Sequence, residues 1–307
     1  MSAGARPATV LATGYGFLEG PRWRDGRLWA SDMLGGRVLA FGEDGSAETV
    51  WAQEGWMPSG LGWDPAGRLV VCSMLDRRLV RIEDGEPVAA ADLSDCTPWP
   101  ANDLLLDGDG GAYVGDFGWD VASDPAIAPA RLMRVDPDGR ARVEVEEVVF
   151  PNGMVLADGG RTLLVAETFA ARVTAFDRAP DGSLSNRRAW ADFAAGEAAP
   201  ARPFATTVEA CAAGVPLPDG IALDADGALW IGDAHGAGAL RVRAGGEVLD
   251  RVEVGEGQTA YAVALGGADG RTLFLCAAVP LGEGDPAEQQ AARLLSCRVD
   301  VPAAGAA

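Results

Sequence analysis

Lysine is absent from this sequence of 307 residues, and histidine occurs once, as His235. Without lysine the chain cannot form a Schiff base with a carbonyl substrate, and it cannot build a Walker-type phosphate-binding loop. A single imidazole excludes an HExxH zinc site. The five cysteines form no CxxC pair. We therefore expect free thiols and a reducing compartment, which places the protein in the cytoplasm.

Positive charge is also scarce. The 25 basic residues face 45 acidic ones, and the formal net charge is −20. Such a charge repels nucleic acid and anionic membrane surfaces. No apolar run approaches the ~18 residues of a membrane span, and the N-terminal segment lacks the pattern of a signal peptide. We expect a small-molecule substrate and no nucleic-acid or membrane partner. The sequence does not indicate an oligomeric state.

A pattern that recurs six times organises the chain. Each copy consists of a short alternating apolar run, a turn rich in Asp and Gly, and a second apolar run, which is typical of a β-hairpin. A third run, and often a fourth, follows each hairpin. The hairpins cover residues 19–31, 59–73, 102–116, 152–167, 219–233 and 261–277. The repeat predicts an all-β fold, a six-bladed β-propeller with a central channel, formed by residues 1–307 as a single domain.

Four segments lie outside the repeat: one is expected to close the ring, and three are long loops. The apolar residues 9–11 precede the first copy, and we expect them to pair with the last blade as an N-terminal strand that closes the ring. Residues 118–130, 194–217 and 281–292 make loops longer than the repeat requires. Long loops in a compact fold are often functional lids. Tolerated surface insertion is the alternative for all three.

The first residue of each copy is expected at one end of the channel. These residues are Glu19, Ser59, Asn102, Asn152, Asp219 and Tyr261. Four of the six are carboxylates or amides, whose hard oxygens suit Ca²⁺ or Mg²⁺ and could also hold Mn²⁺ or Zn²⁺. A divalent cation would remove the repulsion between the converging carboxylates. Alternatively, these side chains cap strand ends and bind water in the channel.

Four segments carry a resemblance to a known family. They are LEGPRW from Leu18, ND at Asn102, FPNGM from Phe150 and PDGIALDADGALW from Pro218. Together they resemble the SMP-30/gluconolactonase/luciferin-regenerating enzyme family, and the resemblance extends through all six copies. It implies a six-bladed propeller with one divalent metal in the channel, and lactone hydrolysis as an activity.

The resemblance also implies roles for individual residues. The metal ligands of the family match Glu19, Asn152 and Asp219, and its channel asparagine near metal and substrate matches Asn102. We take Ca²⁺ as the expected ion, with Zn²⁺, Mg²⁺ or Mn²⁺ as alternatives. Ala101 departs from the family, because sugar-lactone members often carry an arginine there that contacts substrate hydroxyls. This departure argues against a sugar-lactone specialist.

Aromatic residues lie in the loops expected at the channel mouth. In or near these loops lie Trp56, Met57, Trp99, Phe117 and Trp119. They would make the pocket more apolar than a sugar requires, unless they pack beneath the loops instead. The predicted substrate pocket consists of Ser59, Trp99, Asn102, Phe117, Trp119 and Tyr261.

His235 follows the second strand of its hairpin, and so is expected on the metal face. There it could act as an acid, a base or a substrate contact near neutral pH, or it could be an exposed loop residue without a role. Asp32, Asp116 and Glu167 occupy equivalent loops in other copies and are weaker candidates.

The favoured hypothesis is a metal-dependent hydrolase of a lactone or related ester. The metal would polarise the carbonyl and activate water, with Asp219, Asn102 and His235 as the catalytic candidates. One alternative is a non-catalytic, ligand-binding propeller with a structural metal. Another is a propeller enzyme that catalyses an isomerisation or a condensation.

Overall fold

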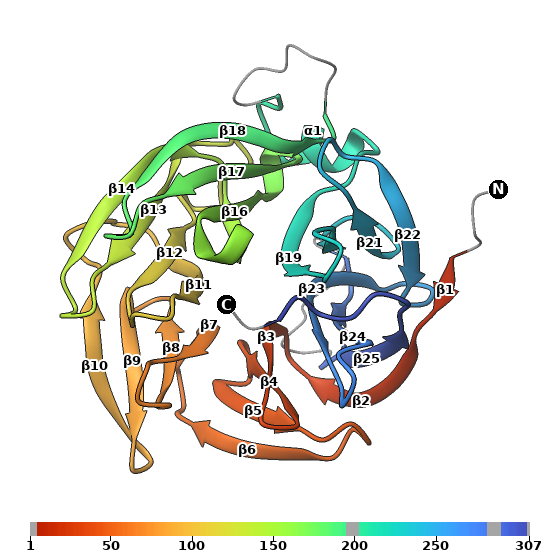
Figure 1. The fold of residues 1–307 in the computed structure, drawn as a ribbon, viewed down its shortest axis with the longest axis horizontal. Helices are drawn as coiled ribbons and strands as arrows, with labels where there is room; N and C mark the ends of the chain where they lie inside the picture. Colours follow the sequence, from red (N-terminus) through yellow and green to blue (C-terminus); the bar gives the residue numbers. More distant parts are fainter. Residues whose placement is uncertain (1–4, 195–202, 281–289, 306–307) are drawn as a thin grey trace. The chain divides into compact units, whose positions relative to one another are not determined.

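The computed structural model describes residues 5–194, 203–280 and 290–305. These residues form six separate sheets, which Figure 1 shows in successive colours along the chain. The first three sheets comprise β3 (Leu18–Arg24), β4 (Arg27–Asp32), β5 (Arg37–Phe41) and β6 (Ala47–Ala52); β7 (Pro58–Trp63), β8 (Leu69–Ser73), β9 (Arg78–Glu83) and β10 (Glu86–Asp92); and β11 (Ala101–Leu106), β12 (Ala112–Asp116), β13 (Ala130–Val135) and β14 (Ala141–Val148).

The last three sheets follow the same plan. They comprise β15 (Pro151–Ala157), β16 (Thr162–Glu167), β17 (Arg172–Arg178) and β18 (Leu184–Asp192); β19 (Pro218–Leu223), β20 (Leu229–Asp233), β21 (Gly238–Val242) and β22 (Val248–Glu253), with β1 (Arg6–Pro7) added; and β23 (Thr259–Gly266), β24 (Thr272–Ala278) and β25 (Ala292–Arg298), with β2 (Thr9–Tyr15). The short helices are η1 (Asp158–Gly160), η2 (Thr168–Ala170) and α1 (Thr207–Ala212).

The six sheets confirm the predicted six-bladed β-propeller. Each blade contains four antiparallel strands in chain order, apart from the strands that the N-terminus adds. The chain divides into two compact units, residues 1–58 with 218–306, and residues 59–217. The first unit contains the first, fifth and sixth sheets, and the second unit contains the second, third and fourth.

The N-terminal strand pairs as predicted. β2 runs antiparallel to β25, with Thr9 opposite Ser296 and Tyr15 opposite Ala292. Figure 1 shows this as a red strand beside a dark blue one. β1 extends the neighbouring sheet by pairing in parallel with β22. Segments nearly 300 residues apart in the sequence therefore share a sheet, as Thr9 and Ser296 show.

The Asp-Gly segments form tight turns, because an aspartate side chain satisfies the backbone of the turn that follows it. Asp107 Oδ1 accepts hydrogen bonds from the backbone nitrogens of Asp109 and Gly111 at 3.0 and 2.9 Å. Asp224 makes the same pair of bonds in the fifth sheet. The glycines of these turns have positive φ, +90° at Gly110 and +77° at Gly227, which L side chains rarely adopt. The turns fix the register of each hairpin, and with it the position of the first strand.

Apolar side chains pack between the sheets of each unit. In the first unit Trp230, Leu273 and Leu275 are fully buried in one core cluster. In the second unit a cluster joins the second and third sheets, and another joins the third and fourth. Burial of large aliphatic and aromatic side chains is the main stabilising contribution in such sheets.

Candidate functional site

The predicted metal-end residues occupy one register position in their sheets. The residue before each of them pairs with the acid that ends the second strand. These pairs are Leu18 with Asp32, Ala101 with Asp116, Pro151 with Glu167, and Pro218 with Asp233. Glu19, Asn102, Asn152 and Asp219 are therefore each the second residue of their strand, in equivalent places.

A break in the pairing accompanies this register position. The ladder of β11 is interrupted between Ala101 and Leu104, so that Asn102 lies within the irregularity. Asn152 and Asp219 lie within the same kind of break in β15 and β19, and Glu19 directly precedes one in β3. Such bulges redirect side chains and are over-represented next to active sites.

In the first unit this position holds two carboxylates, Glu19 and Asp219, on strands that both pack against β23. These strands are β3 and β19, whose second residues are Glu19 and Asp219. Asp219 is only 5% exposed, and the Gly20 backbone nitrogen donates to Glu19 Oε2 at 3.1 Å. Gly220 allows the close approach, because a Cβ there would lie 2.6 Å from the Ala262 Cα. In the pair Asp219-Gly220, the aspartate supplies the acidic side chain and the glycine allows the tight packing that positions it.

Tyr261 is the third residue of β23, which packs against both strands. It is buried, its hydroxyl donates to the Val279 carbonyl at 2.9 Å, and its ring lies 4.7 Å from that of Phe17. The hydroxyl is thus used within the protein. The substrate-pocket role of Tyr261 stays a prediction, and the contacts described are packing contacts within the protein.

In the second unit the same position holds two amides. Asn102 and Asn152 are 7% and 6% exposed. Asn102 Nδ2 donates to the Pro151 carbonyl at 3.2 Å, and Asn152 Nδ2 donates to Thr168 Oγ1 at 3.4 Å. Because both nitrogens are held by protein oxygens, each carbonyl oxygen is oriented for another partner. Buried carboxylate and amide oxygens fit a hard divalent cation in their donor chemistry. Ser59, in β7, is also buried in this unit.

Asp32, which the sequence indicates as a weaker candidate, has a structural role. Its Oδ1 accepts hydrogen bonds from the backbone nitrogens of Gly16 and Phe17 at 3.0 and 3.2 Å. Its Oδ2 pairs with Arg37 at 2.9 Å. The carboxylate therefore fixes the chain that enters β3, just before Glu19.

Glu167 repeats this arrangement in the fourth sheet. Its Oε2 accepts from the backbone nitrogen of Val149 at 2.7 Å, and its carboxylate forms two hydrogen bonds with Arg172 at 3.0 and 2.9 Å. Arg187 and Thr174 also donate to it. Glu167 is fully buried. These contacts use the carboxylate to hold the chain that enters β15, so the structure gives it a supporting role.

Asp116 has the equivalent place in the third sheet. It accepts hydrogen bonds from Thr97 Oγ1 and, at 2.7 Å, from the backbone nitrogen of Arg131. Burial raises the pKa of Asp116 above its ordinary value, and these bonds oppose that rise without cancelling it. Through Thr97, Asp116 holds the segment that precedes β11, the strand that carries Asn102. Through Arg131 it also holds the start of β13.

The aromatic residues of the second unit gather into one cluster. Phe150 contacts three rings, with centroids 4.9 Å away for Phe117, 5.6 Å for Trp119 and 5.0 Å for Phe169. Trp119 and Phe169 are buried, whereas Phe117 and Phe150 are partly exposed. Phe150 lies two residues before Asn152, so the exposed edge of the cluster is next to a predicted ligand. Trp99, half-buried, is held by a backbone bond to Thr97 Oγ1 at 3.0 Å.

Two of the long loops pair with each other. The Ile127 nitrogen donates to the Ala205 carbonyl and the Thr207 nitrogen donates to the Pro125 carbonyl, both at 2.9 Å. α1 follows, with Thr206 as its N-cap, and packs against η2. The loops thus form an ordered layer beside the aromatic cluster. Residues 195–202 and 281–289, which belong to the predicted long loops, lie outside the described residues.

His235 is at the predicted end of its sheet. Pro218 pairs with Asp233, so the turn after Asp233 is at the same end as Asp219. The imidazole is exposed, and its backbone nitrogen donates to Asp233 Oδ1 at 3.3 Å. The only histidine therefore lies in a solvent-facing turn of the fifth sheet.

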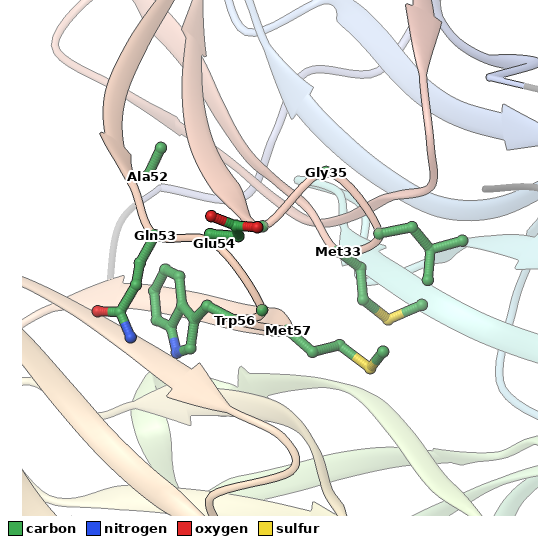
Figure 2. A pocket seen from close by; sticks show the side chains of 10 residues that line it. Met33, Gly35, Ala52, Gln53, Glu54, Trp56 and Met57 are labelled. Carbon is green, nitrogen blue, oxygen red and sulfur yellow. The ribbon is translucent and has the colours of Figure 1, made fainter. Parts of the chain in front are cut away.

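A pocket in the first unit contains residues that the predicted site omits. It has a volume of about 450 Å³ and lies between the β4–β5 turn and the segment that leaves β6 (Figure 2). Its apolar lining includes Met33, Leu34, Trp56 and Met57. The sequence indicates that Trp56 and Met57 are in a mouth loop. The β4–β5 turn, some 20 residues earlier, carries no motif that would connect it to them.

Within the part of the chain that the structure describes, no three histidine, cysteine, aspartate or glutamate side chains group as metal ligands do. The predicted ligand set differs from such a group, since it combines two carboxylates with an amide. None of the described helices has the length and apolar character needed to cross a membrane.

Six four-stranded blades with an equivalent polar residue at the start of several first strands place this chain among the six-bladed β-propellers. Within that class, residues 17–279 match the SMP-30/Gluconolactonase/LRE-like region, and the chain belongs to this family.

Individual relatives agree with this assignment. A pentonolactonase from Haloferax volcanii is 28% identical over 306 residues, covering 96% of this chain and 94% of that protein. The structure is similar to a gluconolactonase from Xanthomonas campestris (23% identity, TM-score 0.67, 99% of this chain and 97% of that chain). It is also similar to regucalcin, a calcium-binding protein from Agrobacterium tumefaciens (19% identity, TM-score 0.77, 98% and 97%). These two structures share the propeller fold.

Proposed function

We propose that this chain is a divalent-metal-dependent hydrolase of a lactone or a related ester. The observation that carries the proposal is the shared register position of Glu19, Asn102, Asn152 and Asp219, each at a break in its strand pairing. Membership of the family, and relatives named as lactonases, support the reaction class.

We propose Glu19, Asn152 and Asp219 as the metal ligands. Two carboxylates and an amide oxygen suit Ca²⁺ best, and the calcium-binding name of one structural neighbour agrees with that choice. Zn²⁺, Mg²⁺ and Mn²⁺ remain alternatives, because oxygen ligands accept them all. When bound, the cation polarises the lactone carbonyl and stabilises the negative charge that develops on its oxygen. We also propose that residues 1–307 form a single domain.

The other residues would position substrate and move protons. Asp219 accepts the proton of the water that attacks the carbonyl carbon, and the ring C–O bond then breaks to give a hydroxy acid. Asn102, whose nitrogen is held by Pro151, presents its carbonyl oxygen to the substrate or to that water. The exposed imidazole of His235 supplies a proton to the leaving oxygen. Ser59, Trp99, Phe117, Trp119 and Tyr261 are proposed to line the substrate pocket.

We further propose that the preferred lactone is less polar than a sugar lactone. Ala101 is fully buried and stands directly before Asn102, so this position offers no side-chain hydrogen bond to a substrate hydroxyl. The aromatic edge at Phe117 and Phe150 adds an apolar surface near the two amides. Both features favour a lactone with few hydroxyl groups.

The test compares Asp219→Ala with wild type for bound metal and for turnover of aliphatic, aromatic and sugar lactones. Asp226→Asn is the matched control, because Asp226 is exposed in the turn of the same sheet. We expect Asp219→Ala to lose both metal and turnover and the control to keep both. Full turnover by metal-free Asp219→Ala would overturn the proposal. A large loss of Tm on chelation, without turnover of any ester by wild type, would favour the non-catalytic, ligand-binding alternative.

A further inference from the structure

The pocket of Figure 2 is connected to the segment that enters β3, the strand that carries Glu19. The Met33 nitrogen donates to the Phe17 carbonyl at 2.7 Å, two residues before Glu19. Leu34 packs against Gly16 so closely that a Cβ on Gly16 would lie 2.8 Å from the Leu34 Cβ. The pocket wall and the start of β3 are therefore one packed structure within the first unit.

The pocket floor is closely packed. The Trp56 ring is 6% exposed and meets Trp51 edge-on, with centroids 4.1 Å apart. Gly36 brings the two segments together at a φ of +63°, and a Cβ there would lie 2.8 Å from the Gln53 carbonyl oxygen. Aromatic packing and a close backbone approach thus fix the two segments that line the pocket against each other.

The pocket is lined by both apolar and polar groups: Met33, Leu34, Trp56 and Met57 supply apolar surface, and Glu54 supplies an acidic group. Met33 and Met57 are half-buried and extend their thioethers to the same side, whereas Gln53 points away from them (Figure 2). Unbranched thioether side chains adapt to apolar groups of different shape. Glu54 is exposed at the rim, and the chain carries a net charge of −20, so an anionic group is disfavoured.

We propose that this pocket binds the apolar substituent of the substrate, an alkyl or aryl group carried on the lactone ring. The inference rests on the proposed function, because it assigns the ring itself to the predicted metal end. The volume of about 450 Å³ is within the range of about 300–1,000 Å³ that small-molecule pockets have. The substrate class is thus a neutral lactone with an apolar side chain.

The kinetic test measures kcat/KM for γ-valerolactone, γ-hexalactone and γ-octalactone, which differ in alkyl length. Burial of each added methylene should raise kcat/KM about fourfold. The double variant M33Q/M57Q should lower the ratio of γ-octalactone to γ-valerolactone at least tenfold. L249Q, at an exposed residue of β22, is the matched control and should leave that ratio unchanged. A wild-type ratio near one, or an unchanged ratio in the double variant, would overturn the inference.

A binding test separates the pocket from the reaction. Protein with ¹³C-methyl methionine is titrated with pyrrolidinone and with a butyl-substituted pyrrolidinone, which are lactams that resist hydrolysis. The Met33 and Met57 methyl signals, assigned from the single variants, should shift only with the butyl compound. If no lactone is hydrolysed, the proposed function fails. The methyl shifts then still show whether the pocket binds the butyl group. If lactones are hydrolysed and the signals do not move, the pocket assignment alone is wrong.

Discussion

Replacement of Glu167 by glutamine tests whether the acids at the ends of the second strands are structural. The fully buried carboxylate receives bonds from Arg172 at 3.0 and 2.9 Å and from the Val149 backbone at 2.7 Å. Glutamine has the same size but only one acceptor oxygen, and its amide N–H groups would face N–H donors. The Arg172 guanidinium, with its side chain 10% exposed, would lose its charged partner.

The expected cost follows from that burial. Removing one partner of a buried ion pair destabilises a protein by about 3–5 kcal/mol, because the remaining charge stays uncompensated. Arg187 adds less, since its side chain is 32% exposed and water screens it. We therefore expect E167Q to lower the free energy of unfolding by about 3–5 kcal/mol.

The assay is urea unfolding followed by circular dichroism. D177N is the matched control in β17, because Asp177 pairs with Arg188 on the surface, where both side chains are nearly half exposed. An exposed pair contributes up to about 1 kcal/mol. If E167Q costs no more than D177N, then Glu167 does not anchor the chain that enters β15, and the reasoning fails for its equivalents as well.

Three further outcomes are expected. Burial raises the pKa of Asp107, but the combined hydrogen bonds and charges, led by Arg134, leave it below the ordinary 3.8. The stability from this pairing is present above that ordinary value and is lost as pH falls through the lowered one, so acid unfolding should be less steep in D107N than in wild type. G60A should lower Tm, because a Cβ would overlap the backbone of the neighbouring first strand, and an unchanged Tm would contradict that packing. Burial raises the pKa of the Cys72 and Cys276 thiols, so a thiol reagent at pH 8 should label at most three of the five cysteines before unfolding, and labelling of all five would refute their burial.

The sequence predicts the blades because their signals are local. Asp-Gly turns such as the one at Asp107 set the hairpin register, and that register places Asn102 and its equivalents at the strand starts. Residues 9–11 form an apolar strand that needs a partner, and this predicts their pairing with the last blade. The pairing of β2 with β25 confirms the prediction.

Contacts between distant segments could not be predicted in this way. Asp32 and Glu167 share the turn positions of functional candidates, and only the structure shows their oxygens bound to backbone nitrogens of preceding segments. The bridge between Ala126 and Thr206 joins two irregular loops, which carry no periodic signal. The pocket around Met33 likewise depends on two segments that meet only in the folded chain.

The central claim is that metal held by Glu19, Asn152 and Asp219 drives lactone opening. The most direct measurement follows acid release from a lactone panel with a pH indicator, before chelation, after removal of metal verified by elemental analysis, and after addition of Ca²⁺. We predict that hydrolysis stops on metal removal and returns with the divalent cation. Hydrolysis at the full rate by verified metal-free protein would contradict the account.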